Sequence, residues 1–307
     1  MTIILNVNNL GKKIGRRHLL QDVNFEVHPG EIFGFLGPNG AGKTTTMRII
    51  TGLMKPTTGK ITICGHDITK NFYKAMIQVG AIVENPESFR YLTGWQNLEQ
   101  AARASGLAIT KERMMECVET VGLTNRIQEL VKGYSLGMKQ RLGIAQAILT
   151  SPKLLILDEP TNGMDPRGVR DMRDMLHRLS REQGMAVFIS THLLLEAQAI
   201  CDRVAILDQG VIVARAKKDE IDSYMKDNEY IFYIGKDKEQ EAKNLVTHMD
   251  YPVRIDPTTS QLVIKIDREG IPSLLKELLA NEIDVFEVNR KGSSLEEYFI
   301  NTTKENL

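Results

Sequence analysis

The feature that most constrains this chain is a glycine-rich stretch at residues 37–45, with the sequence GPNGAGKTT. An apolar run typical of a buried strand precedes it at residues 32–36. Residues 46–50 have helical character, and Gly52 is a helix-ending residue. Because the pattern G-x-x-x-x-G-K-[ST] lies here between a strand and a helix, it predicts a loop that cradles phosphate groups.

Each part of this loop has a physical role in holding a nucleotide. Glycines let the backbone turn its N–H groups inward, and the following helix adds about half a positive charge at its start. We expect Lys43 to bridge the outer phosphates and the Thr44 hydroxyl to ligate Mg²⁺. The predicted nucleotide-binding residues of the loop are Gly37, Pro38, Asn39, Gly40, Ala41, Gly42, Lys43, Thr44 and Thr45.

Polar residues directly follow two further apolar runs, each of which is an expected strand. Asp158 and Glu159 follow the strand expected at residues 154–157, and His192 follows the strand expected at 186–190. Ligands of open α/β sheets bind outside the carboxyl ends of the strands, so we expect these groups at one edge. There, Asp158 can hold Mg²⁺ through its water shell and Glu159 can accept a proton from an attacking water. The pattern predicts a site for phosphoryl chemistry.

Hydrophobic periodicity divides the chain into two domains. The first, residues 1–217, has expected strands at 19–27, 31–36, 61–63, 77–83, 154–157, 186–190, 203–207 and 211–214, with a mostly helical insertion at about 86–151. A charged linker is expected at 217–228. The second domain, residues 218–307, has the order βαββαβ of a ferredoxin-like fold, followed by a last helix at 295–303. It contains no predicted catalytic cluster, and we expect a regulatory or dimer-supporting role.

Composition argues against several classes of protein. Lys+Arg and Asp+Glu are equal at 39 each, so no electrostatic footprint for nucleic acid is expected. The three cysteines form no C-x-x-C pair, which favours a reducing compartment without a zinc site. The N-terminal apolar stretch is too short, and carries too little charge, for a signal peptide. No apolar run reaches the roughly 18–20 residues that a membrane span needs. A soluble cytoplasmic chain is expected.

Residues 134–141, YSLGMKQR, precede an apolar helix and resemble the signature of ABC-transporter ATPases, which is usually LSGGQ followed by polar residues and Arg. Ser135 and Gly137 of the pattern are kept, whereas Leu136 and Met138 depart from it. In that family the signature binds the γ-phosphate of the ATP held by the other protomer. The resemblance, which covers about residues 1–215, therefore implies a dimer of two copies, or a pair with a paralogous cassette.

The resemblance implies roles for single residues. Lys43, Glu159 and His192 would be catalytic, with Glu159 as general base and His192 steadying the γ-phosphate and the attacking water. Asp158 would hold the Mg²⁺ water shell, and Asp165 would belong to a loop that contacts the partner cassette. The fold implied is an α/β P-loop NTPase of the ABC type with a helical subdomain, followed by the small α+β ferredoxin-like domain. The implied cofactors are ATP and Mg²⁺.

Two further positions, outside the signature, differ from the family pattern. Glu84 replaces the usual Gln, which senses Mg²⁺ and the membrane partner, so Glu84 is a candidate for the nucleotide and metal sites. Ile14 replaces the aromatic residue that usually stacks on adenine, which implies weaker stacking on the base. Glu84 and the signature, together with the ending SLEEYF at residues 294–299, resemble ATPases of exporters that protect bacteria against bacitracin and lantibiotics.

The resemblance therefore predicts the ATP-hydrolysing subunit of an exporter, peripheral on the inner face of the cell membrane and bound to separate permease subunits. Docking is expected near residues 84–93, with Leu92 and Trp95 as candidate contacts; core packing is the competing interpretation for both. Three competing functions are a soluble ABC ATPase acting on ribosomes or DNA, an importer ATPase, and a regulatory cassette that does not hydrolyse ATP. The zero net charge argues against a ribosome or DNA partner. The C-terminal βαββαβ pattern argues against an importer, and the intact Glu159 and His192 argue against a cassette that does not hydrolyse ATP.

Overall fold

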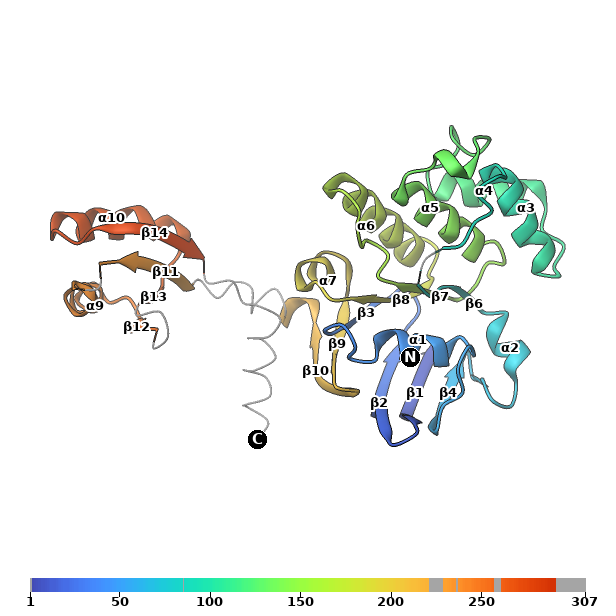
Figure 1. Cartoon of the computed structure of the whole chain (residues 1–307), viewed down its shortest axis with the longest axis horizontal. Helices are drawn as coiled ribbons and strands as arrows, with labels where there is room; N and C mark the ends of the chain where they lie inside the picture. Colours follow the sequence, from blue (N-terminus) through green and yellow to red (C-terminus); the bar gives the residue numbers. More distant parts are fainter. Residues whose placement is uncertain (1, 85, 221–228, 236, 257–260, 291–307) are drawn as a thin grey trace. The chain divides into compact units, whose positions relative to one another are not determined.

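The computed structural model describes residues 2–84, 86–220, 229–235, 237–256 and 261–290 (Figure 1). Two compact units form, one within residues 1–218 and the other within residues 219–301. Among the described residues, no helix is both long enough and apolar enough to cross a membrane. The last helix expected at 295–303 and the ending at 294–299 lie outside the described residues.

A six-stranded sheet forms the centre of the first unit, in the order β10-β9-β3-β8-β7-β6. All neighbours are parallel except β10, which pairs antiparallel with β9. Every residue of β3, β7 and β8 is buried, as expected for continuous apolar strands with both faces covered. The strands are β3 (Ile32–Leu36), β6 (Val79–Ile82), β7 (Leu154–Asp158), β8 (Ala186–Thr191), β9 (Arg203–Asp208) and β10 (Val211–Lys217).

A second, antiparallel sheet has the order β2-β1-β4-β5. Its strands are β1 (Leu5–Ile14), β2 (Arg17–Val27), β4 (Thr58–Ile63) and β5 (His66–Asp67). The segments expected at 19–27 and 31–36 are both strands, but they belong to different sheets: β2 pairs with β1, and β3 pairs with β8 and β9. The turn between them therefore carries the chain from one sheet to the other.

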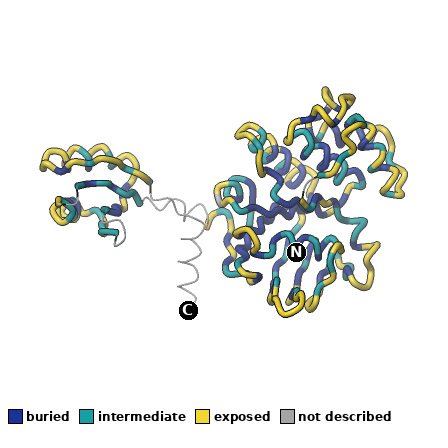
Figure 2. The backbone as a smooth tube through the Cα atoms, viewed as in Figure 1, coloured by how far each residue is buried: buried dark blue, intermediate teal, exposed yellow. Residues whose placement is uncertain are grey.

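The core of the first unit lies between these two sheets. Phe25 of β2 stacks on Phe33 of β3 with ring centroids 5.4 Å apart and lies 5.3 Å from Phe188 of β8. Helix α1 (Lys43–Ile50) adds Met47 and Ile50 to the same cluster. Figure 1 shows α1 between the two sheets, and the central strands β3, β7 and β8 of the six-stranded sheet are buried in Figure 2. This core fixes both ends of the loop that joins β3 to α1.

The other helices of the first unit are α2 (Phe72–Met76), α3 (Gly94–Ala104), α4 (Lys111–Thr120), the short η1 (Val131–Gly133), α5 (Leu136–Ala147), α6 (Pro166–Arg181) and α7 (Leu194–Ile200). Helices α3, α4 and α5 occur between β6 and β7, and α5 contacts both of the others. Thr93 and Gln96 form a capping box that starts α3. Asp165 caps α6, whose first residue is Pro166.

The second unit is a four-stranded antiparallel sheet in the order β12-β13-β11-β14, with two helices. Along the chain the order is strand, helix, strand, strand, helix, strand, which is that of the ferredoxin-like fold. The helices bury Ala242, Val246, Leu274 and Leu278 with the sheet. The elements are β11 (Glu229–Ile234), α9 (Glu239–His248), β12 (Val253–Ile255), β13 (Leu262–Lys265), η2 (Arg268–Gly270), α10 (Ile271–Ala280) and β14 (Val285–Arg290).

Candidate active site

The glycine-rich loop runs from the end of β3 to the start of α1, in a conformation that requires glycine. A Cβ atom on Gly37 would lie 2.1 Å from the carbonyl oxygen of Leu207 in β9, which is a severe clash. Gly42 has a φ of 113°, which residues with a side chain rarely adopt. These two constraints explain why the loop has glycine at positions 37 and 42.

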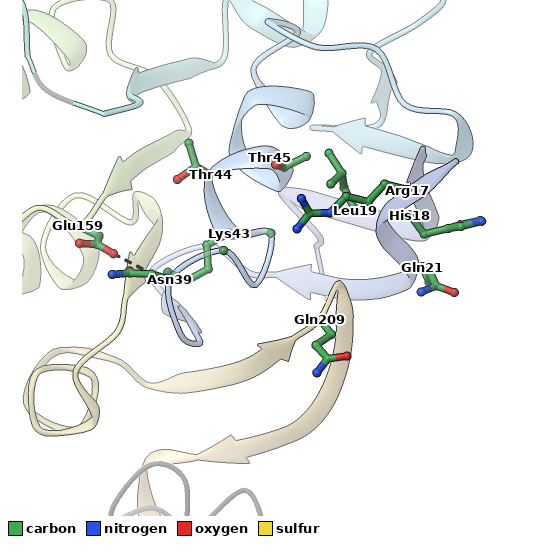
Figure 3. Close-up of a pocket in the computed structure, with 12 residues that line it drawn as sticks. Arg17, His18, Leu19, Gln21, Asn39, Lys43, Thr44, Thr45, Glu159 and Gln209 are labelled. Atoms are coloured by element: carbon green, nitrogen blue, oxygen red, sulfur yellow. Dashed lines mark ion pairs between the residues drawn. The ribbon is translucent and has the colours of Figure 1, made fainter. Parts of the chain in front are cut away.

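Lys43, the first residue of α1, is 5% exposed. Its Nζ donates hydrogen bonds to the carbonyl oxygens of Gly37 (2.7 Å) and Pro38 (3.2 Å) and lies 3.7 Å from Glu159 Oε1. Burial lowers the pKa of Lys43 below its ordinary value, and the Glu159 carboxylate opposes this shift. Figure 3 shows the Lys43 and Glu159 side chains joined across the pocket beside the loop. The ammonium group is thus held at the inner wall of that pocket.

Thr44 and Asp158 meet at the carboxyl ends of β3 and β7. Thr44 Oγ1 donates to Asp158 Oδ2 at 2.8 Å, so a hydroxyl and a carboxylate face the same point. Oxygen ligands of this kind suit Mg²⁺, which is usually held by one or two carboxylates together with substrate phosphates and water. Within the described residues, no group of three or more His, Cys, Asp or Glu side chains could hold a metal alone. The donors present fit a Mg²⁺ that arrives with a nucleotide.

Glu159 and His192 lie side by side next to Lys43. Nδ1 of His192 is 3.2 Å from Glu159 Oε1. This contact is not a hydrogen bond, and Nδ1 is a buried polar atom with no hydrogen-bond partner among the described residues. Glu159 is about three-quarters buried, and its backbone has a φ of 47° in the left-handed region. A carboxylate between a lysine and a histidine, next to the Thr44–Asp158 pair, can act as a base towards a water molecule at this edge.

Two pockets adjoin this cluster. One, of about 500 Å³, is lined by Lys43, Thr44 and Thr45 at the start of α1 and by Arg17, His18 and Leu19 of β2 (Figure 3). Ile14, expected near a nucleotide base, is 54% exposed and is not among the residues that line it. Of the other predicted loop residues, this pocket includes Asn39, Gly40 and Gly42.

The second pocket, of about 440 Å³, brings Glu84 together with Thr44, Asp158 and Glu159. Glu84 also pairs with Arg48 of α1, and its backbone has a φ of 73°. The structure therefore places Glu84 beside the predicted metal ligands Thr44 and Asp158. Its carboxylate forms an ion pair with Arg48 of the helix that follows the phosphate loop.

Ser135, Gly137 and Asp165 line a different pocket of about 830 Å³, whose lining does not include Lys43 or Thr44. Ser135 caps α5, with its Oγ accepting from Met138 N at 3.2 Å. Asp165 caps α6, with its Oδ1 accepting from Gly168 N at 3.1 Å. Both caps are at helix starts on the surface. Thus the predicted residues fall into two groups, one around the phosphate loop and one around the signature.

One site residue was missed by sequence reasoning. Ser190, directly after the apolar residues of β8, donates a hydrogen bond to Asp158 Oδ1 and accepts one from Glu159 N at 2.9 Å. The only sequence signal is a hydroxyl within a strand that otherwise has apolar residues up to Thr191 and His192.

Comparison with known proteins agrees with this geometry. The family model described as ABC transporter matches residues 20–162. A Bacillus subtilis protein named ABC transporter ATP-binding protein YhcH is 45% identical over 99% of this chain and 97% of its own length. The bacitracin transport ATP-binding protein BcrA of Bacillus licheniformis is 38% identical over 98% of this chain and 97% of its own. The lantibiotic transport ATP-binding protein SrtF of Streptococcus pyogenes is 37% identical over 70% and 92%.

Solved structures give the same fold. An ATP-binding cassette, solved as a dimer in a post-hydrolysis state bound to ADP and phosphate, has a TM-score of 0.63 and 26% identity, covering 70% of this chain and 99% of the cassette. The predicted α/β fold of the ABC type and the resemblance to bacitracin and lantibiotic transport ATPases are therefore confirmed.

Proposed function

The chain belongs to the ABC transporter family of ATP-binding proteins, and we propose that it hydrolyses ATP to drive separate permease subunits of an exporter. The observation that carries the proposal is the convergence of Lys43, Glu159 and His192 beside the Thr44–Asp158 pair. Asp158, Glu159 and His192 come from the ends of the adjacent parallel strands β7 and β8, and Lys43 and Thr44 begin the helix that follows β3. This is the edge of the sheet where α/β proteins bind ligands.

In the proposed reaction, water attacks the γ-phosphate of ATP in line with the leaving oxygen, and positioning and charge stabilisation provide most of the rate enhancement. Glu159 orients the water and accepts its proton, since its carboxylate is held between Lys43 and His192. Lys43 binds the outer phosphates from the buried side of the pocket. When bound with ATP, Mg²⁺ offsets the negative charge of the phosphates; Thr44 and Asp158 would hold it, with Glu84 next to them.

Completion of the site requires a second cassette in this proposal. Ser135 and Gly137 line a pocket that lacks the phosphate-loop residues. It shares only Leu136 and Gly163 with the pocket that contains Thr44, so one molecule presents two distinct halves of a nucleotide site. A helix start such as that of α5, which Ser135 caps, favours an anion because of the helix dipole. A second copy, or a paralogous cassette, would apply its α5 to the ATP held on the phosphate loop, and Asp165 would lie at the contact between the two.

The permease subunits are proposed to dock near residues 84–93. The structure directs attention there to Phe89 and Tyr91, which are 52% and 73% exposed and have ring centroids 5.8 Å apart. Leu92 and Trp95, the contacts expected from the sequence, are only partly exposed, and Trp95 Nε1 donates to Glu99 at 2.9 Å. Such docking would hold this chain on the inner face of the cell membrane. The names of the relatives support a peptide antibiotic, or a similar amphipathic compound, as the exported substrate in resistance or immunity.

A Glu159→Gln variant tests the catalytic assignment. Glutamine keeps the size of the side chain but cannot accept the proton, so ATP binding should persist while steady-state hydrolysis falls by about a hundredfold or more. Glu119→Gln, an exposed position on α4, is the matched control and should retain full turnover. Unimpaired hydrolysis in the Glu159 variant would remove it as the base.

A further inference from the structure

We propose that Ser190 is a positioning residue that holds both acidic residues of the site, Asp158 through its carboxylate and Glu159 through its backbone N–H. The inference rests on the proposed ATPase function. It concerns a residue that lies behind the site, in the strand that leads to His192, and that does not line the pockets described above.

The contact follows from the register of the sheet. Strands β7 and β8 are parallel, and Asp158 is the register partner of Ser190. Ser190 is fully buried, and its Oγ donates to Asp158 Oδ1. The other carboxylate oxygen, Oδ2, accepts from Thr44 Oγ1 at 2.8 Å. With one hydroxyl on each oxygen, the plane of the Asp158 carboxylate is fixed from two sides.

The same hydroxyl also holds the next residue. Glu159 N donates to Ser190 Oγ at 2.9 Å, so this oxygen donates one hydrogen bond and accepts another. Glu159 has a left-handed backbone with a φ of 47°, which a residue with a side chain adopts only where the surroundings hold it. Ser190 thus connects the carboxylate on the metal side of the site to the backbone that aims the proposed base.

A buried serine can also be a simple filler, and the chain contains one for comparison. Ser180 in α6 is fully buried, and its Oγ has no hydrogen-bond partner among the described residues. Removing the Ser180 hydroxyl should therefore leave the site unchanged. Removing the Ser190 hydroxyl leaves Asp158 Oδ1 and Glu159 N without this partner, which frees the carboxylate to turn.

Groups that orient a metal-binding carboxylate through hydrogen bonds typically contribute about 10- to 100-fold to metal affinity or activity. We therefore expect Ser190→Ala to weaken metal binding by about tenfold or more, in a complex with nucleotide, because Asp158 loses its fixed plane. Nucleotide binding without metal should change less than about twofold, since the Lys43 contacts and the loop are untouched.

The experiment uses the full chain and Mn²⁺ as the metal. Mn²⁺ affinity is measured by electron paramagnetic resonance with a non-hydrolysable ATP analogue, and analogue affinity is measured separately in EDTA. The variants are Ser190→Ala, Ser190→Thr, which keeps the hydroxyl, and Ser180→Ala. The expected result is weakened Mn²⁺ binding in Ser190→Ala alone, recovery towards the wild type in Ser190→Thr, and unchanged analogue affinity in EDTA for all three.

Mn²⁺ affinity within twofold of the wild type in a folded Ser190→Ala protein would overturn the proposal. If Ser190→Ala does not fold, Ser190→Cys replaces it: a thiol donates weakly, so wild-type Mn²⁺ affinity in that variant would equally overturn the proposal. Failure of the proposed function is a separate result, because it would show as wild-type protein that neither binds the Mn²⁺–nucleotide complex nor hydrolyses ATP.

Discussion

Replacing Asn97 with alanine should loosen the segment that we propose docks the permease. Asn97 is 1% exposed, and its side-chain amide makes three hydrogen bonds to the backbone of that segment. Its Oδ1 accepts from Phe89 N at 2.8 Å, and its Nδ2 donates to the carbonyl oxygens of Phe89 (3.0 Å) and Thr93 (2.9 Å). The Asn97 amide therefore holds the loop that contains Phe89 and Tyr91 against the start of α3.

The expected magnitude follows from these three bonds. At about 0.5–1.5 kcal/mol each, their loss should lower the free energy of opening this segment by about 1.5–4.5 kcal/mol. Since about 1.4 kcal/mol is a factor of ten, amides that depend on the segment should exchange about 10- to 1,000-fold faster. Suitable reporters are the amides of Val131 and Lys132, which donate to Leu92 O and Arg90 O.

Hydrogen exchange followed by mass spectrometry measures the opening, and ATPase assays with and without permease measure the consequence. Asn97→Ala should keep basal hydrolysis within about twofold, because it lies outside the site, while stimulation by the permease falls by about tenfold or more. The control is Gln100→Ala, an exposed position on the same helix. Unchanged protection would refute the structural reasoning. Lost protection with full stimulation would refute docking at Phe89 and Tyr91.

Three other substitutions test separate features. Glu84→Gln should change stability by less than about 1 kcal/mol, because Glu84 is 55% and Arg48 42% exposed in their pair. It should alter permease stimulation more than ATP binding in a titration, and equal coupling would exclude a role in transmission. Ile14 does not line the pocket, but its register partner Arg17 does, so the ring of Ile14→Tyr should reach the base and tighten ATP binding several-fold by calorimetry. Ring stacking contributes about 0.5–1.5 kcal/mol; unchanged affinity would show that the base lies away from position 14. Phe188→Ala should cost about 3–5 kcal/mol in urea unfolding of the first unit, and a loss under about 1 kcal/mol would contradict the inter-sheet core.

The sequence predicts the phosphate loop and the acidic strand end well because each depends on local chemistry. Asp158 directly follows an apolar run, and Lys43 follows a fixed glycine spacing. Parallel strands then bring such ends to one edge whatever their order in the sheet, so Lys43, Thr44, Asp158 and Glu159 could be grouped before any fold was known.

Features that depend on register or on bulges could not be predicted in this way. Strand β1 was not predicted, because its alternation of apolar and polar residues stops after Val7. There the register with β2 shifts before Leu10, and Asn9 has a φ of 48°. Ser190 looks like a strand residue until β7 and β8 are aligned. The Arg48–Glu84 pair joins residues 36 positions apart, in a helix and a loop whose proximity no local pattern encodes.

The central claim is that one molecule carries two separate halves of an ATP site, so that ATP closes a dimer of two copies of this chain. Sedimentation of Glu159→Gln with saturating ATP and Mg²⁺ tests this directly, because trapped ATP should hold the closed form. The account predicts a species of twice the 34.6 kDa chain mass. A second substitution, Ser135→Arg, should return it to the monomer while ATP binding persists. A Glu159→Gln protein that binds ATP and stays monomeric, or a dimer that tolerates Ser135→Arg, would contradict it.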